Sequence, residues 1–141
     1  MYIYKALVGH LPRTNQMKLV NMINQHSDEI VQPVNLTEYD YGIVCQSQAT
    51  YVGVFLVKVV QGQESKEFHV SHFGMVPSHR GVGNGSAMLA LLKEEATGGD
   101  SVVVKIPVDC PSWKKQKLET WGFQSISSET DGNFTSYQLQ I

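Results

Sequence analysis

The sequence lacks any apolar run long enough to cross a membrane. Its longest apolar stretch, from Tyr51 to Val60, is interrupted by Lys58, whereas a membrane helix needs roughly 20 consecutive apolar residues. The first residues contain no basic segment followed by an apolar one, so no signal peptide is expected. These two absences predict a cytoplasmic protein that does not associate with a membrane.

Cysteine is also scarce, because the chain has only Cys45 and Cys110, which form no CxxC pair. Two distant cysteines in a reducing compartment are most simply free thiols, so no disulfide framework is expected. An excess of basic residues is missing too, since 11 Lys and Arg face 13 Asp and Glu for a net charge of -2. Nucleic-acid binding needs a substantial basic surface, so no nucleic-acid partner is expected.

The middle of the chain lacks positive charge altogether. Residues 19–57 contain no Lys or Arg but carry four carboxylates, which leaves a charge of +2 on the rest of the chain. The acidic residues are Asp28, Glu29, Glu38 and Asp40. They either form a solvated acidic surface or attract a cationic partner.

The size and composition are those of one folded domain. The chain has 141 residues, of which 42% are hydrophobic, and this suffices for one core but not for two. No repeat, low-complexity tract or linker divides it. Residues 1–141 are therefore expected to form a single domain.

The hydrophobic pattern alternates between strand and helix periods. Apolar and β-branched runs predict strands at residues 2–7, 41–47, 51–60, 67–76, 101–108, 123–128 and 134–141. Helical spacing predicts helices at residues 12–26 and 87–97, another from Pro111 or Ser112 to Trp121, and a short one within 27–40. Short polar breaks predict that the second to fourth strands form an antiparallel meander. The order β-α-α-β-β-β-α-β-α-β-β indicates an α/β protein with a mixed, mostly antiparallel sheet flanked by helices.

A glycine-rich loop joins the fourth predicted strand to the next helix. It reads His79-Arg80-Gly81-Val82-Gly83-Asn84-Gly85-Ser86. Backbone amides at the start of a helix bind phosphate oxygens, and glycines allow both close approach and positive φ. The spacing fits neither a P-loop, because no Lys follows the glycines, nor the G-x-G-x-x-G dinucleotide fingerprint. On spacing alone, an ordinary glycine-rich turn is as good an interpretation as a phosphate site.

The loop and its surroundings resemble a known cofactor site. Arg80-Gly81-Val82-Gly83-Asn84-Gly85 is similar to the R/Q-x-x-G-x-G/A loop that binds the acyl-CoA pyrophosphate in the GNAT superfamily of N-acetyltransferases. The preceding Met75-Val76-Pro77 resembles the strand end before that loop, and Trp121-Gly122-Phe123 resembles the LGF that closes the family's second conserved region. The resemblance covers essentially the whole chain and implies the GNAT fold.

The resemblance implies direct transfer of an acetyl group from acetyl-CoA to a primary amine in a ternary complex, with no metal. It implies that the Met75 and Val76 backbone pairs with pantetheine, and that an amide of one of them faces the thioester carbonyl. Arg80 is expected to support the loop. The cofactor-binding residues that it implies are Met75, Val76, Arg80, Gly81, Val82, Gly83, Asn84, Gly85 and Ser86.

An attacking amine must first lose a proton, so a base is required. Family members that act on lysine side chains place a glutamate where His69 stands, six residues before Met75. His69 is therefore the leading candidate, followed by His72 on the opposite face of the strand and by Glu67. An imidazole suits the role at neutral pH. Each of these residues is also compatible with an ordinary position on the sheet surface.

The leaving thiolate has no obvious proton donor. Many family members carry a tyrosine five residues before the Phe of LGF, and that position is Leu118 here. Cys110 and Ser112 are near enough in sequence to substitute, although a buried, inert Cys110 is the simpler interpretation. The same helix carries three lysines that either meet the CoA phosphates or form its solvated face, namely Lys114, Lys115 and Lys117.

The family places the acceptor beside the first helices and the second strand, where this chain is acidic. The resemblance and the charge together predict a small-molecule or peptide amine, cationic in character, and a homodimer is a further expected partner. A second interpretation is a non-catalytic acyl-CoA-binding or sensor domain that keeps the loop but lacks the proton-transfer groups. Leu118 favours the sensor domain, and His69 favours the enzyme.

Overall fold

One mixed sheet forms the framework of the protein. The computed structural model describes residues 1–26, 34–107, 110, 112–131 and 134–141, including all their side chains except those of 72–74 and 127–131. The strand order is β1-β2-β3-β4-β5-β7-β6. The strands are β1 (Tyr2–Ala6), β2 (Tyr41–Ser47), β3 (Thr50–Gln61), β4 (Lys66–Met75), β5 (Ser101–Pro107), β6 (Gln124–Asp131) and β7 (Phe134–Gln140). All neighbours pair antiparallel except β4 and β5, which confirms the mixed sheet and the meander predicted from the sequence.

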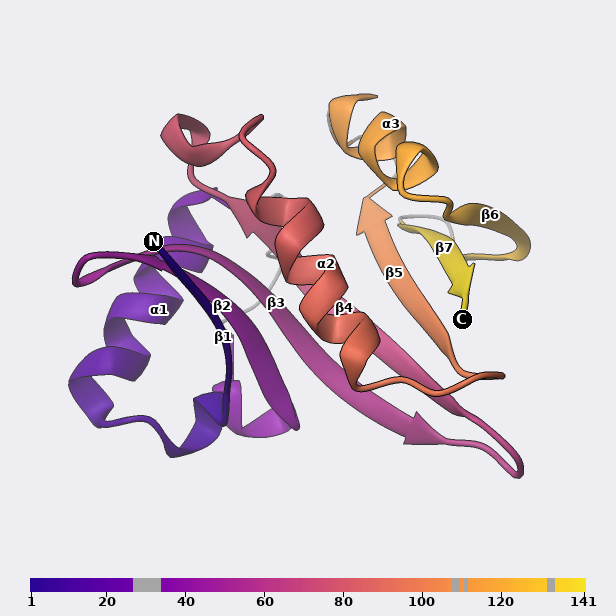
Figure 1. Ribbon diagram of the computed structural model, residues 1–141, viewed down its shortest axis with the longest axis horizontal. Helices are drawn as coiled ribbons and strands as arrows, with labels where there is room; N and C mark the ends of the chain where they lie inside the picture. The colour runs from indigo at the N-terminus through magenta and orange to yellow at the C-terminus, as the bar shows by residue number, and fades with distance from the viewer. Residues whose placement is uncertain (27–33, 108–109, 111, 132–133) are drawn as a thin grey trace.

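In the part of the chain that the structure describes, three α-helices pack on the sheet. They are α1 (Arg13–His26), α2 (Asn84–Glu94) and α3 (Ser112–Thr120). α2 connects the parallel strands β4 and β5 and lies across the front of the central strands in Figure 1. α3 follows β5 and leads into the β6–β7 hairpin at the C-terminus. Three short 3-10 helices cover Val8–His10, Leu36–Glu38 and Pro77–His79.

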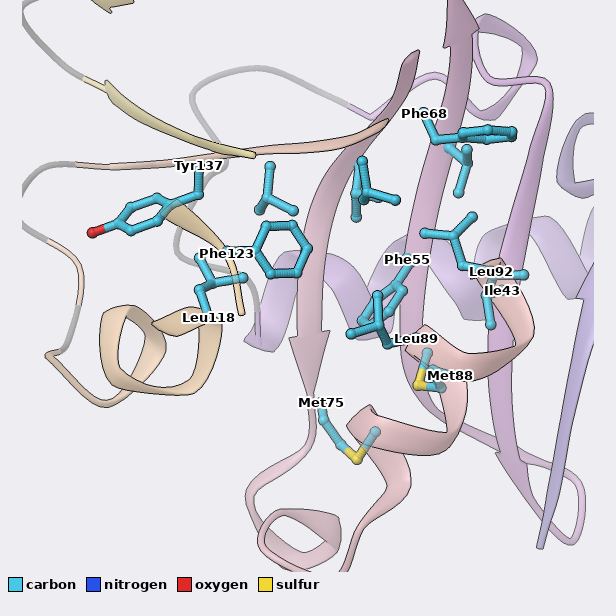
Figure 2. Packing of buried hydrophobic residues seen from close by; sticks show 14 of the residues in the cluster. Ile43, Phe55, Phe68, Met75, Met88, Leu89, Leu92, Leu118, Phe123 and Tyr137 are labelled. Carbon is cyan, nitrogen blue, oxygen red and sulfur yellow. The ribbon is translucent and has the colours of Figure 1, made fainter. Parts of the chain in front are cut away.

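Each face of the sheet has its own hydrophobic core. On one face, side chains of the central strands pack against Leu89 and Leu92 of α2 and Leu118 of α3, as Figure 2 shows. On the other face, Leu19 and Ile23 of α1 pack against strand residues of opposite parity. Successive side chains of a strand point to opposite faces, so the central strands are buried on both sides. This explains why their sequences read as nearly continuous apolar runs.

Two predicted segments begin or extend differently from expectation. The helix predicted at 87–97 begins earlier, at Asn84, because Gly83 takes the N-cap position with a φ of 87°. The first turn of α2 is therefore built from the glycine loop itself. Of the helix predicted within 27–40, the structure contains a 3-10 turn at Leu36–Glu38, and residues 27–33 lie outside the described part.

α3 ends where the sequence predicts, before Gly122, and the two cysteines form no disulfide, as expected. Gly122 takes a left-handed φ of 94°, and the amide of Phe123 bonds back to the Leu118 carbonyl at 2.9 Å, which is a Schellman termination. Pro111 lies outside the described residues, and the helix begins at Ser112. Cys45 and Cys110 are buried, and neither forms a disulfide.

β4 and β5 are paired over only part of their lengths. Their described parallel register runs from Glu67 beside Ser101 to Val70 beside Val104. The register between β3 and β4 then shifts opposite Phe55, and such a bulge bends the strand that contains it. Beyond the bulge, the ends of β4 and β5 part, which opens the sheet on the side where α2 and α3 begin.

Asp100 fixes the closed end of this β4–β5 pair. Its Oδ1 accepts the Lys66 amide at 2.8 Å, and its Oδ2 accepts the Thr97 amide at 2.8 Å. The carboxylate thus joins the start of β4 to the turn before β5. These hydrogen bonds to backbone amides, first from Thr97 and then from Lys66, lower the pKa of Asp100.

We expect Asp100→Asn to destabilise the fold in a pH-dependent way. A carboxyl whose pKa is lower in the folded state contributes stability above its unfolded pKa of about 3.9, and this contribution disappears as the pH falls through the folded pKa. Urea unfolding of both proteins should show a lower midpoint for the variant at pH 7, with the two midpoints converging in acid. A difference that stays constant with pH would show that the charge is not the cause.

Candidate functional site

A cavity of about 220 Å³ occupies the opening between β4 and β5. Its walls come from the end of β4, the glycine loop, the first turn of α2, and α3. It is lined by Phe55, Met75, His79, Arg80, Gly81, Gly83, Asn84, Gly85, Trp113, Lys117 and Trp121. Six of the nine residues expected to bind the cofactor are therefore gathered around one space. Of the other three, Val82 is 69% exposed, Val76 contacts a second cavity, and Ser86 bonds to Trp121.

The glycine loop has the backbone geometry of an anion cradle. Gly81 and Gly83 have φ values of 78° and 87°, and no atom lies within 4 Å of where a Cβ would stand on either residue. The open space above them allows a ligand to approach the backbone. The Asn84 side chain donates to the His79 carbonyl at 3.1 Å, which ties the two ends of the loop together.

The charges around the cavity are of one sign. Among the described lining residues, Arg80 and Lys117 are cationic and none is a carboxylate. The amides at the start of α2 add the positive end of the helix dipole. This combination attracts an anion such as a phosphate, and it agrees with the weakly basic remainder predicted from the sequence.

One stripe that runs along α3 and ends just after it, at Trp121, forms a wall of the cavity. Trp113, Lys117 and Trp121 follow one another at intervals of four residues and all line the cavity. Trp121 donates its indole N–H to Ser86 Oγ at 3.0 Å, and a Cβ on Gly85 would come 3.0 Å from the same ring. The i, i+4, i+8 spacing was a signal for this stripe.

Two cations lie over the rings of this stripe. The Arg80 guanidinium carbon is 4.7 Å from the centroid of the Trp113 ring, and Lys117 Nζ is 5.6 Å from that of Trp121. Both distances are within the range of cation–π attraction. The stripe therefore holds the cationic side chains of the cavity in place.

The end of β4 directs one backbone amide into the opening. The Val76 amide donates to the Val52 carbonyl at 2.8 Å, and the Val76 carbonyl accepts from His79 at 3.0 Å. Successive backbone groups of an antiparallel strand point to opposite edges, so the Met75 amide points away from β3 and toward β5. The Met75 carbonyl, on the same edge, accepts from Arg80 Nε at 2.8 Å. Of the two amides expected to face a ligand, that of Met75 is available.

The candidate bases lie farther along β4. His69 Nε2 is 3.1 Å from Glu67 Oε1, and both side chains point to the face opposite that of Phe68 and Val70, which pack toward α2. Six residues of extended strand span at most roughly 20 Å, and Met75 packs in the same cluster as Phe68 and Val70. His69 is therefore not brought next to Met75, and it is not among the residues that line the cavity. The side chain of His72 lies outside the described part of the chain.

A second cavity, of about 480 Å³, lies on the α1 face of the sheet. It is lined by Lys18, Asn21, Met22, Gln25, His26, Ala49, Thr50, Tyr51 and Val76. Val76 is the neighbour of Met75 in the chain, so the two cavities approach the end of β4 from opposite faces. Met75 and Val76 stand between them.

The acidic residues of the N-terminal half have separate positions. Asp40 Oδ2 accepts the Val59 amide at 2.6 Å, which is a structural role at the end of β3. Glu38 is exposed in a 3-10 turn. Asp28 and Glu29 lie outside the described residues. The carboxylates within the described part thus do not line the α1-side cavity, and the cationic character of an acceptor stays a prediction.

Neither sequence-based substitute for the missing tyrosine faces the cavity. Leu118 is fully buried and lies beside Phe123 in the core (Figure 2). Burial raises the pKa of Tyr137, and Glu119 raises it further. Cys110 is buried in the same core cluster as Tyr137, and it is not among the residues that line the cavity. Ser112 is exposed. No cluster of His, Cys, Asp and Glu suited to a metal ion occurs among the described residues.

Comparisons with known proteins give similarity in structure but not in sequence. No family model matches the chain, and no curated protein matches it in sequence. Naa50 of Arabidopsis thaliana, solved with the bisubstrate analogue CoA-Ac-MVNAL, matches with a TM-score of 0.74 at 11% identity over 100% of both chains. A protein of the GNAT family from Desulfovibrio desulfuricans matches with a TM-score of 0.67 at 14% identity, over 99% of this chain and 98% of its own.

A further match is the ribosomal-protein-S18-alanine N-acetyltransferase of Escherichia coli. Its TM-score is 0.66 at 12% identity, over 99% of this chain and 94% of its own. The matches over nearly whole chains identify the architecture of seven strands and three helices in the described residues as a known fold.

None of the described helices is both long and apolar enough to span a bilayer.

Proposed function

The chain has the GNAT fold, and we propose that it is an N-acyltransferase that moves an acetyl group from acetyl-CoA to a primary amine. The observation that supports this most is the cavity between β4 and β5, where a glycine cradle, two cations and an available backbone amide meet. A phosphate group and a thioester carbonyl are the ligand groups that such an arrangement fits. Naa50, which shares the fold, is solved with an analogue that joins CoA to an acetylated peptide.

The glycine loop would hold the pyrophosphate of CoA. The amides of Val82, Gly83, Gly85 and Ser86 belong to the loop and the first turn of α2, where amides have no intrahelical partner. Arg80 keeps the loop next to the strand through its bond to Met75. The charge of the phosphates would be balanced by these donors and by nearby cationic side chains.

The end of β4 would activate the thioester. As the amine attacks the carbonyl carbon, negative charge develops on the carbonyl oxygen, and the Met75 amide would donate a hydrogen bond to it. A donor aimed at that position is worth about 3 kcal/mol of barrier. The C–S bond then breaks, and the amide product and CoA leave.

The acceptor would approach from the α1 face through the second cavity. This cavity contacts Val76, directly beside the proposed carbonyl site, and its lining combines apolar side chains with hydrogen-bonding ones such as Asn21 and Gln25, which suits a peptide or a small amine. The acceptor classes to compare are a polyamine, an aminoglycoside, a lysine-containing peptide and a peptide with a free N-terminus. A preference for the cationic acceptors would support the charge prediction.

We expect His69→Ala to lower turnover at pH 7 without changing CoA affinity. His69 lies on the α1 face of β4 and is paired with Glu67, so it would accept the proton of the amine through water. General-base catalysis contributes on the order of 100-fold. The check is kcat against pH for both proteins, together with the Kd of CoA by calorimetry. Unaltered turnover would exclude His69 as the base.

The alternative is a non-catalytic acyl-CoA-binding or sensor domain. The observation that favours it is Leu118, which is part of the core and provides no proton for the leaving thiolate. Both functions predict saturable binding of acetyl-CoA, so binding alone does not separate them.

Thiol release distinguishes the two functions. The full chain is incubated with acetyl-CoA and each acceptor class, and free CoA is measured with a thiol reagent. The enzyme predicts release that depends on the acceptor and saturates with it. Saturable binding without acceptor-dependent release would support the sensor domain, and absence of acetyl-CoA binding would contradict both.

A further inference from the structure

A small apolar hollow lies next to the cavity between β4 and β5, which we call the donor cavity. The volume of the hollow is about 10 Å³, close to the least space that holds one water molecule. In the described part of the chain it is lined by aliphatic and aromatic side chains, among them Val70 of β4, Val104 of β5 and Leu118 of α3. Because apolar cavities stay dry, the hollow can take an apolar group but not a polar one.

One aromatic side chain, that of Phe55, stands between the hollow and the donor cavity. Among the described residues, Phe55 and Trp121 line both spaces. Trp121 lies at the glycine-loop end of the donor cavity, because its indole N–H donates to Ser86 Oγ at 3.0 Å. Phe55 is 3% exposed and lies beside Leu89 (Figure 2). The partition nearest to β4 is therefore the Phe55 ring.

Phe55 also lies near the proposed carbonyl site. Gly53 of β3 pairs with Met75, and Phe55 is two residues farther along β3, so its side chain points to the same face of the sheet as that of Met75. Such diagonal neighbours on adjacent strands are within reach of aromatic side chains. Both side chains line the donor cavity, and Phe55 shares the hollow with Val104 of β5. The space beside its ring thus extends across β4 to the edge at which the Met75 amide points.

We propose that Phe55 limits the acyl group of the donor to acetyl, an inference that rests on the acyltransferase function proposed above. With the thioester carbonyl at the Met75 amide, the methyl group of acetyl would end against the Phe55 ring. A longer chain would have to displace this ring into a close-packed core, because the hollow behind it has room for about one water molecule. A chain that turned to the α1 face instead would occupy the path of the amine.

The test is acceptor-dependent CoA release from acetyl-, butyryl- and hexanoyl-CoA with the same acceptor. One methylene changes kcat/KM by about 10-fold to 200-fold where a hydrophobic pocket limits the substrate. For the wild-type protein we therefore expect kcat/KM with butyryl-CoA, which is two methylenes longer, to be on the order of 100-fold below that with acetyl-CoA, and hexanoyl-CoA to be poorer still. Equal kcat/KM with acetyl-CoA and butyryl-CoA would overturn the proposal without any variant.

Variants assign the limit to the side chain. Phe55→Ala joins the hollow to the donor cavity and should raise the kcat/KM ratio of butyryl-CoA to acetyl-CoA by about tenfold or more. Phe55→Leu removes less of the core and should change the ratio in the same direction by a smaller factor, so it serves where Phe55→Ala folds poorly. Phe68→Ala is the matched control, because Phe68 is also 3% exposed, belongs to the same core cluster and lines neither space. An unchanged ratio in both Phe55 variants, or an equal change in Phe68→Ala, would overturn the proposal.

Binding without an acceptor distinguishes failure of this inference from failure of the proposed function. Each methylene that becomes buried raises the affinity by about fourfold. Calorimetry should therefore show that Phe55→Ala binds butyryl-CoA about tenfold more tightly than the wild-type protein does, with little change for acetyl-CoA. If no acceptor gives thiol release, which contradicts the acyltransferase function alone, this shift supports the acyl limit and its absence overturns it. A wild-type protein that binds no acyl-CoA would overturn both proposals.

Discussion

Gly83→Asp is expected to lower the affinity for CoA by about 1000-fold. Gly83 is the N-cap of α2, and the space where its Cβ would stand is open toward the cavity. A carboxylate there would lie within about 4 Å of a bound phosphate, and two like charges at that distance repel by about 4 kcal/mol in a partly screened site. At 1.4 kcal/mol per factor of ten, this repulsion gives the expected loss. The measurement is the Kd of CoA by calorimetry.

Gly83→Asn is the matched control for this change. Asparagine has the same size as aspartate, and both tolerate the left-handed φ of 87° at this position better than other residues. The comparison therefore isolates the charge from the strain and the added volume. Gly98→Asp, in an exposed turn with no atom near its Cβ position, should leave the Kd unchanged. Equal losses for Gly83→Asp and Gly83→Asn would show that no anion binds at this loop.

Met75→Pro is expected to lower kcat/KM by about 100-fold or more, which is the typical cost of removing one oxyanion donor. Proline removes the amide that points toward β5 and leaves the ladder bond of Val76 to Val52 intact. The preceding residue is Gly74, which adapts to the restriction that proline imposes on its predecessor. Initial rates of thiol release with a good acceptor provide the measurement.

Two controls separate the amide from the side chain and from the fold. Met75→Ala removes the same buried side chain but keeps the amide, so the difference between the two variants reports the amide. Val76→Pro removes an amide that donates to Val52 and should therefore reduce thermal stability more than Met75→Pro does. If Met75→Ala loses as much activity as Met75→Pro, the amide of Met75 is not a donor in the reaction.

The fold was predictable because each element carries a local signal. Apolar runs with short polar breaks define the meander, and the glycine loop marks the start of α2. The parallel β4–β5 pair follows from the helix between them, since parallel neighbours need a crossover. The observed start of α2, with Gly83 as its N-cap, differs only slightly from the predicted start, because residues of the glycine loop also form the first helical turn.

The sequence predicted only those parts of the site whose residues lie close together in the chain. Residues of the glycine loop were found, since their spacing carries the chemistry. The i, i+4, i+8 spacing places Trp113, Lys117 and Trp121 on one stripe, but tertiary packing decides that this stripe lies against the first turn of α2 and so becomes a wall of the cavity. Lys114 is 0% exposed, so the expectation of a solvated face is wrong for it, and its burial contradicts the intrinsic preference of lysine for water. The choice between the amides of Met75 and Val76 depends on the strand register.

Because β4 and β5 pair over a short stretch, a ligand bound between their separated ends is expected to stabilise the folded protein. In the described part of the chain, the strand pairing between β4 and β5 runs from Glu67 to Val70, so the ends of the two strands beyond it are not held together by backbone pairing. A molecule held along the free edge of β4 and by α3 would bridge these ends. At a concentration of 100 times its Kd, such a ligand stabilises the folded state by about 2.7 kcal/mol. The loaded protein would then resist proteolysis better than the empty one.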